Sequence, residues 1–248
     1  MSDFLRIGGI IDVSTKDWPK KVVSVIFTIG CNYKCKFCHN KPLLDPTAGE
    51  DWNINSIRNR IEKNFLVDGV SITGGEPTLQ KDIIHLCKTL KEIKKLVSLD
   101  TNGSHPEIIK LLLPYVNRIA LDLKAPLELN GNRLKQIIIT NLDPQKIKDT
   151  IKIVQSSKNI QFEIRTTYVK KLHTPDDLKN IINYLKKIDF NGDYVIQQYQ
   201  YSDGVGENYR ELFEEPSFEE IKDILNNYEN LPYKIYVRAR EIGYKQII

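Results

Sequence analysis

The sequence predicts an α/β protein, a partial and open (β/α)6 barrel in which a parallel sheet is covered by helices. Short β-branched runs alternate with amphipathic stretches, which is the pattern of βα units around a parallel sheet. The runs are nearly continuously apolar, as strands covered on both faces are. Six β/α repeats fall short of the eight, over about 250 residues, that close a barrel. A flat doubly wound sheet is the alternative.

The strand-like runs follow one another at fairly regular spacing along the chain. They are residues 22–29, 69–73, 96–101, 118–124, 161–169 and 194–199, with a last run at 234–239. In either geometry, ligands bind at the carboxyl ends of the strands, so motifs at those ends are the candidates for function.

Periodicity and capping residues predict helices between these strands. Apolar residues recur at three- and four-residue steps over 79–93, which indicates an amphipathic helix. Residues 174–177 (Thr-Pro-Asp-Asp) combine a cap, a first-turn proline and two acids. Residues 217–220 (Ser-Phe-Glu-Glu) form a capping box before another periodic run.

Composition is that of a folded protein. The 248 residues are 41% hydrophobic and 27% charged, and 36 Lys+Arg against 32 Asp+Glu give a formal charge of +4. No run approaches the roughly 18–20 apolar residues of a membrane span. MSDFLRIGGI does not resemble a signal peptide. We therefore expect one cytoplasmic domain over 1–248, with neither a membrane nor a nucleic acid as partner.

Three of the four cysteines lie together directly after the first predicted strand. Cys31, Cys35 and Cys38 are spaced by four and three residues, so one short loop could wrap an inorganic core. Cysteine runs of this kind hold iron–sulfur clusters, usually through four ligands. Here the remaining cysteine, Cys87, falls among the apolar residues of a predicted helix. Three ligands would leave one iron open to a small molecule, as an open position does in catalytic zinc sites.

Zinc and redox alternatives fit the spacing less well. A structural zinc site has four ligands and would need His39, which is awkwardly placed beside Cys38. A redox Cys-x-x-Cys pair would leave Cys31 unexplained. Buried structural thiols would not gather on a loop that contains Lys34 and Lys36. The pattern therefore favours an iron–sulfur cluster.

These residues resemble the signature of the radical S-adenosylmethionine (SAM) superfamily, Cys-x3-Cys-x-aromatic-Cys, with Phe37 as the aromatic residue. Residues 73–77 (Thr-Gly-Gly-Glu-Pro) resemble its glycine-glycine-glutamate motif. Residues 99–103 (Leu-Asp-Thr-Asn-Gly) and 121–124 (Leu-Asp-Leu-Lys), with Cys38-His39-Asn40, are similar to the branch that activates glycyl radical enzymes. The resemblance is dense over about 5–130.

Within that branch, two further segments point to one subgroup. Residues 8–12 with 17–19, and residues 68–72 before the glycine motif, most resemble activating proteins of anaerobic ribonucleoside-triphosphate reductases. Taken singly, a Gly-Gly pair or Asn102-Gly103 could be an ordinary turn, and Lys124 a solvated base. Four motifs in order, each at a predicted strand end, are harder to explain in that way.

The resemblance implies one [4Fe-4S] cluster on Cys31, Cys35 and Cys38, with SAM on the fourth iron. Other implied contacts to SAM come from strand ends. Gly74 and Gly75 would let the backbone approach its methionyl group, Glu76 would pair with its ammonium group, and Phe37 would lie near its adenine. Asp100, Thr101 and Asp122 resemble ligands of a monovalent cation, Lys124 would neutralise the SAM carboxylate, and Arg165 is a further candidate contact.

The implied activity is reductive cleavage of SAM and formation of a glycyl radical on a partner, anaerobic ribonucleoside-triphosphate reductase. Flavodoxin or ferredoxin would donate the electron. One alternative is another glycyl radical enzyme, or a small-molecule substrate such as a deazapurine precursor. A zinc-binding nucleic-acid adaptor is the alternative of another class, although no aromatic-basic groove supports it.

Overall fold

The computed structural model describes residues 3–127, 132–202, 205 and 211–248, so residues 128–130 of the motif-bearing segment 5–130 lie outside it. Its ten strands form one sheet in the order β10-β9-β8-β7-β6-β5-β4-β2-β1-β3. The strands are β1 (Phe4–Ser14), β2 (Val23–Thr28), β3 (Glu50–Asn53), β4 (Gly69–Gly74), β5 (Leu96–Thr101), β6 (Arg118–Asp122), β7 (Gln161–Tyr168), β8 (Asp193–Gln198), β9 (Lys234–Ala239) and β10 (Gly243–Gln246).

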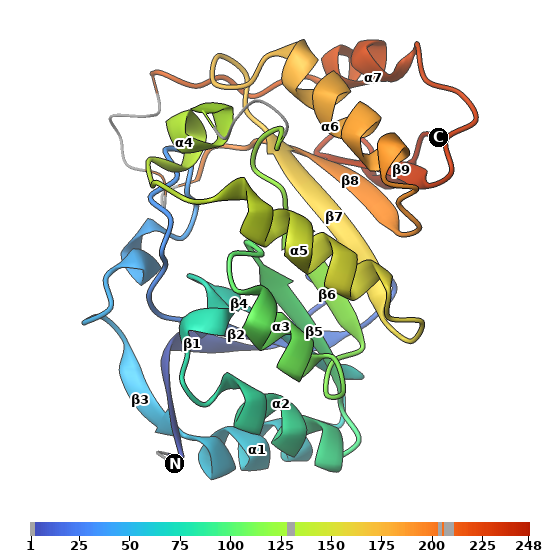
Figure 1. Ribbon diagram of the computed structural model, residues 1–248. Coiled ribbons are helices and arrows are strands. Elements are labelled where there is room, and N and C mark those ends of the chain that lie inside the picture. The colour runs from blue at the N-terminus through green and yellow to red at the C-terminus, as the bar shows by residue number, and fades with distance from the viewer. Residues whose placement is uncertain (1–2, 128–131, 203–204, 206–210) are drawn as a thin grey trace.

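Helices connect the parallel strands, as the apolar periodicity predicts (Figure 1). The α-helices are α1 (Ile54–Lys63), α2 (Ile83–Glu92), α3 (Pro106–Leu112), α4 (Asn132–Ile138), α5 (Pro144–Gln155), α6 (Pro175–Lys187) and α7 (Phe218–Leu225). Two 3-10 turns, η1 (Lys41–Leu44) and η2 (Pro77–Leu79), follow β2 and β4. Thr174 and Ser217 form the capping boxes of α6 and α7, which confirms both predicted helix starts.

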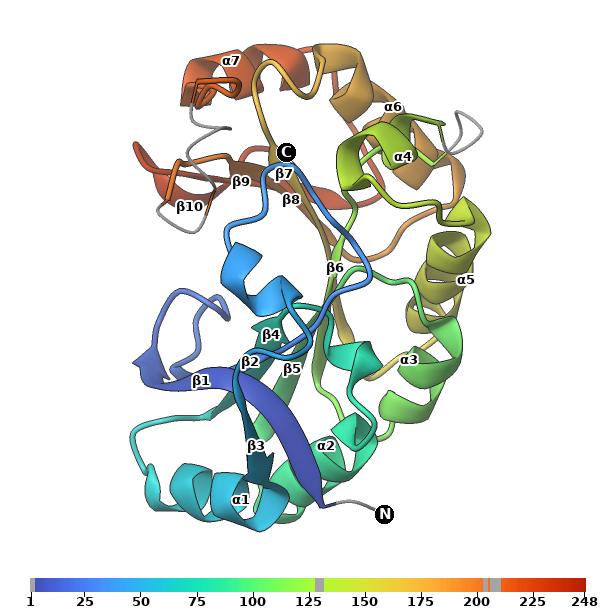
Figure 2. The ribbon, with the colours of Figure 1, turned by 90° about the vertical axis from the view of Figure 1, so that its left-hand side faces the viewer.

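Strand order distinguishes the partial barrel from a doubly wound sheet. From β2 to β9, each new parallel strand is added on the same side of the previous one. A doubly wound sheet reverses that direction at a switch point. In the part of the chain that the structure describes, the two ends of the sheet do not pair. Figure 2 shows them as separate edges, β1 and β3 below and β9 and β10 above, with helices around the outside. The predicted open barrel is confirmed.

The sequence reading misses three strands, β1, β3 and β10, and all three are antiparallel additions at the ends of the sheet. β1 contains Gly8-Gly9 and has two register irregularities against β2. Its residues alternate poorly between buried and exposed. Edge strands of this kind lack the continuous apolar runs by which the parallel strands were recognised.

The core lies between the sheet and its helices, while one aromatic side chain covers the amino-terminal end of the barrel. Trp18, in the turn between β1 and β2, packs on Val23 and Val25. Its indole N–H donates to Gln161 at the start of β7 (3.1 Å). This contact encloses the lower end of the barrel interior and leaves the carboxyl ends of the strands as the accessible face.

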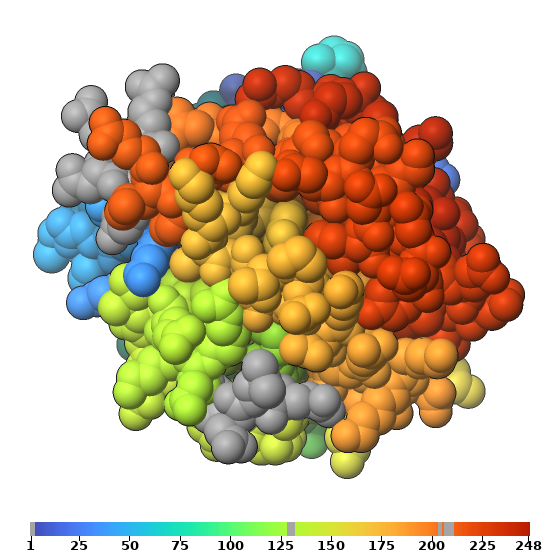
Figure 3. All heavy atoms as spheres, turned by 90° about the horizontal axis from the view of Figure 1, so that it is seen from above, coloured from blue at the N-terminus to red at the C-terminus, as the bar shows by residue number. Residues whose placement is uncertain are grey.

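Seen from above, that face carries segments from distant parts of the sequence (Figure 3). α4, in lime, lies beside the gold β7–α6 segment, and Arg133 of α4 pairs with Asp177 of α6. Lys170 pairs with Glu220 of α7, in red. None of the helices in the described ranges is long and apolar enough to cross a membrane.

Candidate functional site

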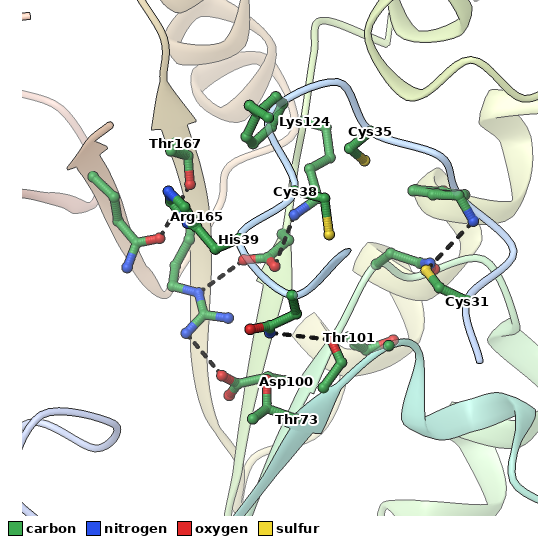
Figure 4. Close-up of a pocket in the computed structure, with 18 of the residues that line it drawn as sticks. Cys31, Cys35, Cys38, His39, Thr73, Asp100, Thr101, Lys124, Arg165 and Thr167 are labelled. Carbon is green, nitrogen blue, oxygen red and sulfur yellow. Dashed lines mark hydrogen bonds and ion pairs between the residues drawn. The ribbon is translucent and has the colours of Figure 1, made fainter. Parts of the chain in front are cut away.

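A cavity of about 360 Å³ lies at the carboxyl ends of the parallel strands. Its wall combines the loop after β2 with the ends of β4, β5, β6, β7, β8 and β9 (Figure 4). This is the place where ligands bind in β/α barrels. All three clustered cysteines line the cavity, and Cys87 lies away from it in α2.

Backbone contacts fix the loop that carries the cysteines. Gly30 has φ +85°, a left-handed conformation that favours glycine, and its N–H donates to the Leu43 carbonyl (2.7 Å). Further along, the Lys34 N–H donates to the Ile138 carbonyl of α4 (2.9 Å). The loop is therefore held at its start and between its first two cysteines, and all three thiols line the cavity.

The three thiols fit an iron–sulfur cluster by their chemistry. Cys31, Cys35 and Cys38 are half-buried. Burial raises the pKa of the Cys31 thiol to about 12 and that of Cys35 to about 11, so both are protonated at neutral pH in the metal-free protein. Iron binds the thiolate form, so coordination would displace those protons.

No group of three or more His, Cys, Asp or Glu side chains within the described ranges stands close enough to hold a single metal ion. A cluster is wider than one ion, and thiolates on different irons stand further apart. A set of soft sulfur ligands around one cavity is the donor set that such clusters use. The residues present therefore fit the predicted group.

The glycine pair of the second motif brings β4 against the cysteine loop. Gly74 has φ +116°, and a Cβ there would overlap the backbone of Thr28. A Cβ at Gly75 would overlap the Gly30 carbonyl. The Glu76 N–H also donates to that carbonyl (2.8 Å). The close approach that these glycines permit is thus one of backbone to backbone, at the base of the cysteine loop.

Glu76 is fully buried and joins the ends of two strands. Its carboxylate accepts hydrogen bonds from Thr78, from the Thr101 hydroxyl (2.7 Å) and from the Asn102 N–H (2.7 Å). It does not line the cavity, whereas Thr101 and Asn102 do. Burial raises the pKa of Glu76, and these hydrogen bonds oppose that effect. In this structure, therefore, Glu76 contributes to the site by setting the position of β5 beside β4.

A chain of alternating charges crosses the strand ends. Lys124 pairs with Asp122 (2.9 Å), and the Arg165 guanidinium bridges Asp122 (2.9 Å) and Asp100 (3.0 Å). Burial alone would raise the pKa of Asp122, but Arg165 and Lys124 outweigh it and lower the pKa to about 2. For Asp100, burial has the larger effect and raises the pKa despite Arg165.

The same chain continues into the barrel interior. Arg118 is completely buried and lies between Glu163 (2.9 Å) and Asp100 (3.6 Å). Its Nη1 also donates a hydrogen bond to the Ser98 hydroxyl oxygen (2.7 Å). The positive charges of Arg118, Arg165 and Lys124 are thus each matched by a carboxylate, as buried ionic groups require.

Two of the predicted cation ligands, Asp100 and Asp122, lie on either side of the Arg165 side chain. The Arg165 guanidinium lies between the carboxylates of Asp100 and Asp122, so a cationic group is already present there. The Thr101 hydroxyl donates to Glu76. A monovalent cation beside SAM stays a prediction.

Phe37 is buried where the cysteine loop meets β6. Its ring lies edge-on to His173 (5.8 Å between centroids), and the Lys124 ammonium is 5.8 Å from the Phe37 centroid. Nδ1 of His173 accepts from the Val169 N–H, and Nε2 lies 3.0 Å from the Lys124 carbonyl. Burial lowers the pKa of His173 to about 4, so the ring is neutral and holds the chain after β6 in place.

Three polar residues of the cavity wall, Thr167, Gln197 and Arg238, lie outside the sequence motifs. Asn40, Thr73 and Asn102 also line the cavity; they belong to those motifs, but the sequence assigns them no role. His39 is also on the wall: its ring stacks on Tyr199 (5.4 Å) and Nε2 lies 2.8 Å from the Gln200 carbonyl, which ties the cysteine loop to the end of β8. Only the alternation of inward-facing residues along β8 and β9 could have indicated Gln197 and Arg238.

Comparison with known proteins identifies one family and two relatives that belong to a single branch of it. The model of the radical SAM superfamily matches residues 25–185. Two relatives from Methanocaldococcus jannaschii are themselves inferred glycyl-radical enzyme activating enzymes. One is 38% identical over 83% of this chain and 85% of its own length. The other is 32% identical over 66% of this chain and 63% of its own length.

A solved structure shares the fold. SuiB of Streptococcus suis, determined with S-adenosylmethionine bound, superposes with a TM-score of 0.63 over 87% of this chain and 50% of that chain. The identity is 18%, so the likeness concerns the fold alone.

Proposed function

Because the chain belongs to the radical SAM superfamily and to its branch of glycyl-radical enzyme activating enzymes, we propose that it installs a glycyl radical on anaerobic ribonucleoside-triphosphate reductase. The observation that carries the proposal is the cavity in which three thiols of one loop face the ends of the parallel strands. The sequence similarity to activating enzymes over most of the chain supports the glycyl radical partner. The resemblance of residues 8–12 and 17–19 supports the reductase as that partner.

In this proposal, Cys31, Cys35 and Cys38 hold one [4Fe-4S] cluster, and reduced flavodoxin or ferredoxin is the electron donor. When bound, the cluster supplies the electron that splits SAM into methionine and a 5′-deoxyadenosyl radical, which takes a hydrogen atom from a glycine Cα. The cofactor performs the radical chemistry, while the protein orients SAM and the hydrogen donor and excludes water from them.

The side chains around the cavity would orient SAM. The Lys124 ammonium is held by Asp122 and faces the cysteine loop, so it can neutralise the SAM carboxylate. Phe37 gives an apolar surface for adenine. Arg165 fixes Asp100 and Asp122 and keeps this arrangement rigid before SAM binds.

The experiment combines anaerobically reconstituted protein, a reductant, SAM and the reductase of the same organism. A SAM-dependent glycyl-radical doublet in the EPR spectrum, with 5′-deoxyadenosine in the same sample, is expected. Deoxyadenosine without the doublet would reject this partner and leave another glycyl radical enzyme or a small molecule as the substrate. Colourless protein that contains zinc and no iron would reject the radical chemistry altogether.

A further inference from the structure

Two side chains on neighbouring strands line the cavity on the side away from the glycine motif. Gln197 of β8 and Arg238 of β9 are partners in the parallel register, so they lie side by side. Both are part of the cavity wall. β9 and β10 form one end of the open sheet, which places this pair close to the open side of the barrel.

Arg238 differs from the other cations of the interior. Arg118, Arg165 and Lys124 each pair with a carboxylate, whereas no carboxylate of the described ranges lies within ion-pair distance of Arg238. Arg238 is half-buried, and its guanidinium carbon lies 5.3 Å from the centroid of the Tyr244 ring. Burial and the charge of Arg165 lower the pKa of Arg238, and the Glu163 carboxylate opposes them from beyond ion-pair distance.

A guanidinium without an ion pair on the cavity wall does not stabilise the folded protein. A half-buried cation without an ion pair loses part of its hydration, and a cation–π contact restores only part of that loss. Five N–H donors in a planar fork are therefore available to an oxygen ligand that enters the cavity.

Gln197 has a donor available in the same place. Its Oε1 accepts from the Thr167 hydroxyl (3.4 Å), which directs the amide. The Gln197 Nε2 has no acceptor in the part of the chain that the structure describes. Two adjacent side chains of the cavity wall thus have N–H groups with no acceptor among the described residues. Their complement is a ligand with acceptor oxygens.

The pair lies towards one end of the groups expected to hold SAM. The glycine motif, Phe37 and Lys124 lie on the loop after β2 and on β4 to β6, and Arg165 lies on β7, whereas Gln197 and Arg238 are on β8 and β9. Extended protein chain presents main-chain carbonyl oxygens at regular intervals, and these are the acceptors that two neighbouring donors can bind together.

We propose that Gln197 and Arg238 form a donor pair that binds main-chain carbonyl oxygens of the protein segment whose glycine loses hydrogen. This inference rests on the proposed function, because it requires a protein as the hydrogen donor. Gln197 and Arg238 are then specificity-determining residues that position the segment beside SAM.

Two substitutions test the pair by different routes. Arg238→Met removes the guanidinium, and Gln197→Glu keeps the size of the side chain but supplies a carboxylate that neutralises Arg238 from its register partner. Arg240→Met is the matched control, because Arg240 is exposed and pairs with Glu215 outside the cavity. Each variant is reconstituted with iron and assayed for glycyl-radical formation on the full-length reductase of the same organism.

We expect KM for the reductase to rise about 10- to 100-fold in Arg238→Met and in Gln197→Glu, as for loss of a charge-assisted hydrogen bond. The dissociation constant of SAM is expected to change less than twofold. Deoxyadenosine formed per glycyl radical should increase, because the poorly held segment no longer captures every radical. Arg238→Lys, which keeps the charge but not the fork, should recover only part of the loss.

Several outcomes would overturn the inference. An unchanged KM in both variants would show that the pair does not contact the segment. Weakened SAM binding would assign Arg238 to the SAM site, and a lower melting temperature with an unchanged KM would make its contact with Tyr244 structural. If wild-type protein cleaves SAM but gives no doublet on the reductase, the proposed function fails first and the inference falls with it.

Discussion

The two sides of the cavity differ in how completely their charged groups are matched. Along β5, β6 and β7, Asp100, Arg165, Asp122 and Lys124 form a continuous series of ion pairs. On β9, Arg238 has an aromatic ring beside it and, among the described residues, no carboxylate at ion-pair distance. A matched network holds its own geometry without a ligand, whereas an unmatched donor gains its partner on binding. The difference suggests a preorganised cofactor side and a substrate side completed by the partner.

The largest effect is expected at the cysteine loop, on which both sides depend. Cys35→Ala removes one of three ligands, and a cluster held by two cysteines is not retained. We expect loss of nearly all iron and of SAM cleavage. Iron content, visible absorbance and 5′-deoxyadenosine measure this, and Cys87→Ala is the control because Cys87 lies in α2 away from the cavity. Retained cleavage in Cys35→Ala would refute the cluster assignment.

The second prediction compares the same substitution on the two sides. Arg165→Met leaves the buried Asp100 and the partly buried Asp122 without their shared cation, and we expect the free energy of unfolding to fall by about 3–5 kcal/mol. Arg238→Met removes a cation without a partner and should change it by less than about 1 kcal/mol. Urea unfolding of both variants measures the difference. Equal losses would abolish the distinction between the two sides.

The parallel barrel could be predicted from the sequence, and so could the part of the cavity wall that the cysteine and glycine motifs form. Strands covered on both faces leave continuous apolar runs, and the cysteine and glycine motifs have fixed local spacing. Each of the seven predicted strands lies within two residues of the observed bounds at either end. The edge strands β1, β3 and β10 were not predicted, because exposed antiparallel strands carry weaker patterns.

Contacts between segments that are distant in the chain could not be predicted from the sequence. The bonds of Glu76 to Thr101 and Asn102 depend on the register of β5 beside β4. The adjacency of Gln197 and Arg238 likewise appears only when β8 and β9 are paired. The sequence does not show whether a charged side chain has an ion-pair partner, because that partner can come from any strand of the sheet.

A third prediction concerns His173, which supports the matched side behind Phe37. Burial holds its pKa at about 4, below the ordinary 6.5, so the unfolded chain binds more protons than the folded protein between these values. Stability should therefore fall as pH decreases from 6.5 to 4, by about 3 kcal/mol in total.

Urea unfolding at several pH values in this window, for wild type and His173→Gln, measures the effect. The glutamine variant cannot take up a proton and should lose most of the slope between pH 6.5 and 4. An equal slope in both proteins would mean that other groups cause the acid sensitivity.

The fourth prediction concerns Asp122, whose effect is smaller than that of His173 and falls in a different pH window. The ion pairs with Arg165 and Lys124 lower its pKa from 3.8 to about 2, so it is the unfolded chain that takes up a proton as pH falls through 3.8. The stabilisation, about 2 kcal/mol, is complete above pH 3.8 and disappears as pH falls through about 2. Asp122→Asn should therefore be less stable than wild type by about 2 kcal/mol at pH 5.5, and this difference should become smaller below pH 3.8.

Urea unfolding of both proteins at pH 5.5 and pH 3 measures this difference in stability. A gap that is independent of pH would show that Asp122 acts through its shape and hydrogen bonds and not through its charge, and the matched side of the cavity would then owe its rigidity to packing.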